Sequence, residues 1–81
     1  MTLKQFLEQA FEPGDDSQFM QNTLIEARLG EGTTVRYYGT LIARIDHKTK
    51  QARFYNANYS ISTRRRIEIL RKIARDKKYE V

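Results

Sequence analysis

Apolar residues recur at helical spacing in two stretches, one near each end of the chain. The first stripe consists of Leu3, Phe6, Leu7, Ala10 and Phe11. The second consists of Ile67, Ile69, Leu70, Ile73 and Ala74. Each stripe marks one face of an amphipathic helix. Thr2 and Gln5 fit a capping box for the first helix. Pro13-Gly14 predicts where it ends, and Ser62 or Thr63 is the expected N-cap of the last helix.

Between these stretches the apolar pattern changes to a period of two, which is typical of half-buried strands. We predict strands from Asn22 to about Leu29, from Thr34 to Ile45 and from Gln51 to about Asn56. GEGT at 30–33 and DHKTK at 46–50 have the composition of turns. Gly39 lies within the long second strand and indicates a bulge or a close backbone approach. Residues 15–22 fit either a loop or one further short helical turn.

The order of these elements predicts an α+β fold in a single domain covering residues 1–81. It consists of an N-terminal helix, a three-stranded antiparallel meander and a C-terminal helix. We expect both helices to pack on one face of the sheet and the other face to be open to solvent. The residues assigned to the open face are Arg28, Arg36, Tyr38, Ile42, Arg44, Arg53 and Tyr55.

Composition narrows the classes of protein that remain. The chain has 81 residues, a formal charge of +5, one histidine and no cysteine. Disulfides and thiolate metal sites are excluded, and we expect no metal and no cofactor. The excess of basic residues favours an acidic partner, either nucleic acid or the acidic surface of a protein or nucleoprotein. No apolar run is long enough to span a bilayer and no signal peptide is recognisable, so we expect a cytoplasmic protein without a membrane partner.

The residue types needed for catalysis are sparse. His47 falls in a predicted hairpin loop, where we expect it to be exposed to solvent. Asp15-Asp16 follows a Pro-Gly turn, where aspartates commonly act as caps. Gly30-Glu31-Gly32 lacks the spacing and the strand-to-helix setting of a phosphate-binding loop. No nucleophile stands beside an oriented base, so we expect a protein that is not an enzyme.

Basic residues form the strongest candidate binding site. Arg64, Arg65 and Arg66 directly follow the expected N-cap of the last helix, where the helix macrodipole disfavours positive charge. Arg71 and Arg75 continue this basic stripe, and Glu68 lies within it and is expected to offset part of its charge. The open sheet face interleaves arginine with tyrosine, an arrangement suited to stacking bases and holding phosphates. The alternative is that both surfaces are ordinary solvated faces.

Residues 33–70 resemble short, uncharacterised bacteriophage proteins that carry two strands followed by a Gly-Trp-x-x-x-Thr-Thr-x-x-Arg-Ile segment. The matching stretches are Gly39-Thr40-Leu41-Ile42-Ala43 and Asn58-Tyr59-Ser60-Ile61-Ser62-Thr63-Arg64-Arg65-Arg66-Ile67. This sequence has Asn-Tyr where Gly-Trp is usual and Ser-Thr in place of Thr-Thr. The resemblance implies a phage or mobile-element origin and a strand-strand-helix core. It implies no activity.

Two functional hypotheses follow from these patterns. In the first, the protein is a small accessory factor that binds nucleic acid or a nucleoprotein through the basic helix start and the arginine-tyrosine sheet face. In the second, it is a protein-interaction module that inhibits a host defence complex, in the manner of an anti-CRISPR protein, or a transcription complex. Ile42 with Tyr38 would then form an apolar centre. A homodimer formed through a strand edge or the open face is a further possibility.

Overall fold

A computed structural model describes residues 1–12, 14, 16–19, 22–28, 32–55 and 60–81. Two helical segments come first, followed by five strands and a long helix. The elements are α1 (Leu3–Glu8), η1 (Gln9–Phe11, a 3₁₀ turn), β1 (Ser17–Phe19), β2 (Thr23–Arg28), β3 (Gly32–Tyr37), β4 (Thr40–Asp46), β5 (Gln51–Phe54) and α2 (Ile61–Asp76). The predictions for Pro13, for Asp15 and for segments 29–31 and 56–59 lie outside the described residues. So does the side chain of Arg28.

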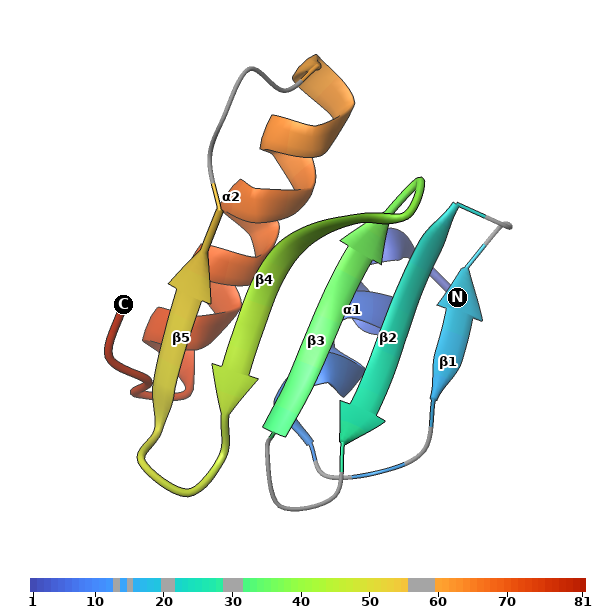
Figure 1. Ribbon diagram of the computed structural model, residues 1–81. Coiled ribbons are helices and arrows are strands. Elements are labelled where there is room, and N and C mark those ends of the chain that lie inside the picture. Colours follow the sequence, from blue (N-terminus) through green and yellow to red (C-terminus); the bar gives the residue numbers. More distant parts are fainter. Residues whose placement is uncertain (13, 15, 20–21, 29–31, 56–59) are drawn as a thin grey trace.

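The strands form one antiparallel sheet in the order β1-β2-β3-β4-β5. Both α1 and α2 lie behind this sheet in the view of Figure 1. The buried core combines Phe6 and Leu7 of α1, Leu70 of α2, and Ile25 and Val35 of the sheet. The predicted α+β class, with helices packed against the sheet, is therefore confirmed. Within the described residues the sheet has five strands, so the predicted three-stranded meander was too coarse.

A tight turn divides the long strand predicted from Thr34 to Ile45. Tyr38 and Gly39 both have positive φ, at 50° and 79°, and Tyr37 pairs with Thr40 across them. This is a two-residue hairpin with the handedness that matches the twist of its strands. The assignment of Gly39 to a mid-strand bulge was wrong, because the glycine supplies the left-handed backbone of the turn. Tyr38 is consequently at the tip of a hairpin and not on the open face.

A bulge does occur three residues further on, at Ile42. Val35 pairs with Ala43 and Arg36 pairs with Leu41, which leaves Ile42 as the extra residue in β4. Ile42 is 0 % exposed and belongs to the core. The prediction that Ile42 lies on the open face was therefore wrong. Strict alternation would have placed it there, but a bulge shifts the facing of every residue beyond it.

The N-terminal segment has the predicted helix and an unpredicted strand. The Thr2–Gln5 capping box is present, with the two reciprocal hydrogen bonds at 2.9 and 3.2 Å. Residues 17–19 pair with β2 as an edge strand, where the sequence left open a loop or a short helical turn. Phe19 of this strand packs against Phe6 of α1, with ring centroids 5.2 Å apart. That contact attaches the edge strand to the core.

Helix α2 begins earlier than the sequence indicated. Ser60 is its N-cap and accepts a hydrogen bond from the amide of Thr63, so the prediction of Ser62 or Thr63 was wrong. At the other end Lys78 adopts a left-handed backbone with φ of 63°. The amide of Tyr79 then donates to Ala74 and that of Lys78 to Arg75, which is the Schellman pattern of helix termination. Glu80 continues into a bridge with Gln51 and covers the start of β5.

Gly32 and Gly39 allow a matched test of backbone strain. A Cβ on Gly32 would overlap the carbonyl oxygen of Ile45, and its φ is +94°. A Cβ on Gly39 would meet nothing within 4 Å, although its φ is also positive. We expect Gly32→Ala to lower the free energy of unfolding by about 2–4 kcal/mol. Gly39→Ala should lower it by only about 1 kcal/mol. Urea titration followed by circular dichroism measures both, and equal losses would contradict the close approach at Gly32.

Candidate functional site

Two arginines stand directly opposite each other on the open face of the sheet. Arg44 of β4 and Arg53 of β5 are paired in the register, and both are exposed. Like charges at such paired positions repel each other. No carboxylate of the described residues lies within 4.0 Å of either guanidinium group. The two positive charges are thus left for solvent or for an anionic ligand.

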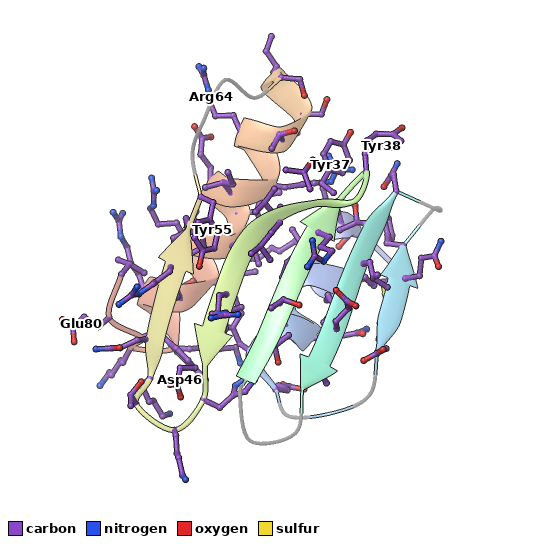
Figure 2. All side chains as sticks on the ribbon, viewed as in Figure 1. Tyr37, Tyr38, Asp46, Tyr55, Arg64 and Glu80 are labelled. Carbon is purple, nitrogen blue, oxygen red and sulfur yellow. The ribbon has the colours of Figure 1, made fainter. Side chains whose placement is uncertain are left out.

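Helix α2 extends this positive charge around the edge of the sheet. The guanidinium of Arg71 lies over the ring of Phe54 in β5, with Cζ 5.3 Å from the centroid. Arg64 and Arg75 are separated from Arg71 by seven and four residues and therefore lie on the same stripe of the helix. Both are exposed, and the described residues contain no ion pair to either. Figure 2 shows nitrogen-bearing side chains projecting on the β5 and α2 side of the molecule.

We refer to Arg44, Arg53, Tyr55, Arg64, Arg71 and Arg75 as the β5 basic surface. Tyr55 continues β5 on the same side as Arg53, and its amide donates to the carbonyl of Ile42 at 3.0 Å. Tyr55 is 36 % exposed. From the sequence, Glu68 was expected to offset part of the positive charge of this helix stripe. Among the described residues, however, Glu68 forms no ion pair within 4.0 Å. This surface therefore combines unpaired cations with one accessible aromatic ring.

Arg36 and Tyr38, also assigned to the open face from the sequence, do not join this surface. Nε of Arg36 lies 2.8 Å from Oε1 of Glu26, so its charge is already neutralised. The same guanidinium donates to the carbonyl of Gly39 at 3.2 Å and braces the hairpin. Tyr38 is 72 % exposed at the hairpin tip, where its ring packs edge-on against Tyr37. The apolar residues of the open face are Leu24 and Leu41, which flank Arg36 in the register and are half-buried.

Arg66 is a structural residue and not part of an exposed arginine cluster. It is only 9 % exposed. Its Nε donates to the hydroxyl of Thr23 at 3.0 Å, and Nη1 donates to the carbonyl of Ser62 at 3.1 Å. Its guanidinium also lies over the ring of Tyr37, 4.1 Å from the centroid. The expectation that Arg66 belongs to an exposed basic cluster with Arg64 and Arg65 was wrong, because Arg66 lies on the inner face of α2 and its long side chain reaches Thr23 of β2 and Tyr37 of β3.

The remaining arginine of the run, Arg65, faces a different direction. It is exposed and lines a groove between the N-terminal parts of α1 and α2. The run Arg64–Arg66 is thus divided among three sides of one helix, as a rotation of about 100° per residue requires. With Ser60 as the N-cap, Arg64 is the fourth helical residue. The macrodipole penalty expected at the very start of the helix is correspondingly weaker, because it fades within the first turn.

His47 belongs to a half-buried hydrogen-bond chain, so the prediction that it is solvent-exposed was wrong. The hydroxyl of Tyr79 donates to the carbonyl of Phe11 at 3.4 Å and therefore accepts from Nδ1 of His47 at 3.2 Å. Nε2 then accepts from the hydroxyl of Thr33 at 2.7 Å. Thr33 is 2 % exposed, which keeps this hydroxyl away from any substrate. These hydrogen bonds connect β3, the β4–β5 turn and the C-terminal segment.

Burial sets the ionisation of this cluster. It lowers the pKa of His47 and raises the pKa of Tyr79, so both side chains favour their neutral forms. The neighbouring Asp46 carboxylate partly opposes the change at His47. The pKa of Asp46 itself is lowered, chiefly because its carboxylate accepts the amides of Thr49 and Lys48.

Within the described residues, no group of three or more histidine or acidic side chains is placed to hold a metal ion. In the same part of the chain, none of the helices has the length and apolar character needed to cross a membrane. Comparisons with family models, with characterised proteins and with solved structures found no match to this chain.

The contrast between Arg66 and Arg64 gives a stability prediction. Arg66→Ala removes two hydrogen bonds, the contact with Tyr37 and the packing of a buried stem. We expect it to lower the free energy of unfolding by about 2–3 kcal/mol. Arg64→Ala, at an exposed site, should change it by no more than about 0.5 kcal/mol. Urea unfolding of both variants is the measurement, and a stable Arg66→Ala protein would mean that Arg66 is not structural.

The His47 cluster predicts a pH dependence of stability. Because the pKa of His47 is lower in the folded chain than its ordinary value of about 6.5, the unfolded chain binds more protons just below that pH. The free energy of unfolding should fall as the pH drops from 7 to about 5, and it should level off below the pKa of the folded state. The His47→Gln protein should have a lower free energy of unfolding at pH 7, and this free energy should change little between pH 7 and about 5. Identical pH profiles for the two proteins would refute the assignment.

Proposed function

We propose that this protein is a small, non-enzymatic factor that binds nucleic acid through the β5 basic surface. The observation that carries the proposal is the opposed pair Arg44 and Arg53, exposed and without a carboxylate partner in the described part of the chain. Folding places two like charges face to face, where they repel each other. A phosphate bound between them turns this repulsion into two attractive contacts.

The shape of the surface suits an extended polyanion better than an isolated one. Arg71, Arg64 and Arg75 continue the positive charge along α2 beyond the edge strand. A phosphate backbone carries charges at regular spacing, so one strand can contact several of these guanidinium groups in succession. A single small anion would satisfy only one or two of them.

Tyr55 favours a single strand over a duplex. Its ring is accessible beside Arg53, and stacking of one base on an aromatic ring is worth about 1–3 kcal/mol. Bases in a duplex are already stacked on one another and are not available to the ring. The proposal therefore concerns single-stranded nucleic acid, and the origin of the chain in a phage or mobile element stays a prediction from the sequence.

The version of the inhibitor hypothesis that rests on Ile42 with Tyr38 loses its apolar centre. Ile42 is buried in the core and Tyr38 is at the tip of a hairpin, so the two do not form one exposed patch. A contact with a host defence or transcription complex would need another surface. A homodimer formed through a strand edge also stays a prediction.

Salt-dependent binding tests the proposal. Fluorescence polarisation with a labelled single-stranded oligonucleotide should give an affinity that falls steeply as salt rises. Replacing both Arg44 and Arg53 by Gln removes two phosphate contacts, so the slope of log K against log salt should become shallower by about 1.4. Tyr55→Ala should weaken single-strand binding roughly fivefold or more while leaving the salt slope unchanged.

Lys77→Gln is the matched control, because it removes one positive charge near Glu12 and away from the proposed surface. It should leave the slope within experimental error. A wild-type affinity that is millimolar at low salt would end the proposal. So would a Lys77→Gln effect as large as that of replacing Arg53 alone.

A further inference from the structure

A groove between the N-terminal parts of α1 and α2 lies outside the β5 basic surface. It has a volume of about 600 Å³ and is open to solvent. This is within the range of about 300–1,000 Å³ that is typical of ligand-binding clefts. The residues that matter for its chemistry are Leu3, Lys4, Ile61, Arg65, Arg66 and Ile69.

The groove has an apolar component that the fold does not require. Leu3 and Ile69 are half-buried and connect its floor to the core. Ile61, the first residue of α2, is 85 % exposed. A β-branched apolar residue gains nothing at an exposed first-turn position, since its helix propensity is modest and its side chain meets only water. Ile61 lies at the edge of the apolar floor, where its side chain could pack against a bound partner.

The charge of the groove has one sign. Lys4, Arg65 and Arg66 are its ionisable residues, and no carboxylate of the described residues comes within 4.0 Å of any of them. Arg66 is held by Thr23 and Ser62, so its buried charge is hydrogen-bonded but not neutralised. An acidic group in the groove would offset a charge that is costly to bury alone.

We propose that this groove docks a short acidic segment of a partner protein that also carries a large apolar side chain. The carboxylates would contact Arg65 and Lys4, and the apolar side chain would rest on Leu3, Ile61 and Ile69. A nucleic-acid phosphate satisfies the cations but leaves the apolar residues in water, so it is the weaker match. An apolar patch with arginine beside it is also the composition found at the centre of protein interfaces. This inference does not depend on the proposed function.

The test uses a labelled peptide of repeated Asp-Phe-Glu-Leu, a counterpart with Ser in place of Phe and Leu, and a counterpart with Lys in place of the acids. Amide chemical shifts of the ¹⁵N-labelled protein should change around the groove with the first peptide. The other two peptides should bind at least tenfold more weakly. Failure of the first peptide to bind at millimolar concentration, or shifts confined to the β5 basic surface, would overturn the proposal.

Arg65 and Arg64 supply a matched pair of variants, because they are adjacent, exposed and on different sides of α2. Arg65→Glu should weaken peptide binding at least tenfold, and Arg64→Glu should change it less than twofold. Ile61→Ser should weaken it at least fivefold without altering the unfolding midpoint. With the oligonucleotide the pattern should reverse, so that Arg64→Glu has the larger effect.

The two ligands also separate the two proposals from each other. Loss of oligonucleotide binding with retained peptide binding would remove the nucleic-acid function and leave the groove intact. Equal effects of Arg64→Glu and Arg65→Glu on the peptide would show attraction to net charge alone and would refute the groove. An oligonucleotide that shifts the groove amides and displaces the peptide would also refute it.

Discussion

Strand β4 contains three consecutive apolar residues, Leu41, Ile42 and Ala43, and the bulge that accommodates them determines both faces of the sheet. Ile42 is the extra residue, so it joins Ala43 in the core while Leu41 and Arg44 face outward. Without the bulge, Ile42 would stand in water and β4 would lose a central core contact. Arg44 lies in the regular part of β4 and keeps the outward position expected from alternation, where it is paired with Arg53 of β5.

The ion pairs are distributed unevenly over the open face of the sheet, so its β2–β3 half and its β4–β5 half differ chemically. In the described residues the carboxylates within 4.0 Å of a cation are those of Glu26, beside Arg36, and of Glu12, beside Lys77. Both pairs lie away from the β5 basic surface. On the β2–β3 half of the open face the charge of Arg36 is therefore paired, whereas the described residues contain no ion pair to Arg44 and Arg53 on the β4–β5 half or to Arg64 and Arg75 on α2.

Patterns confined to one element were readable in the sequence, and those that depend on pairing were not. The capping box at Thr2 and the apolar stripe of α2 follow from local spacing. The sequence did not reveal that the long strand is divided, because Tyr-Gly is not a strong hairpin signal. The alternation of apolar residues before the turn also continues after it without a break in its period of two. The burial of Arg66 was hidden because its partners, Thr23 and Tyr37, come from strands more than twenty-five residues away. Arg44, Arg53 and Tyr55 were correctly placed outside the core.

Helix α2 links these features because it presents a different chemistry on each of three sides. Its inner side buries Leu70 and Ile73 and uses Arg66 to reach the sheet. The side toward β5 carries Arg64 and Arg71, and the side toward α1 carries Arg65 and Ile69. Consecutive arginines in a helix cannot act as one cluster, since each successive side chain is rotated by about 100°. The run that looks like a single basic motif in the sequence therefore supplies one structural residue and one residue to each of two separate surfaces.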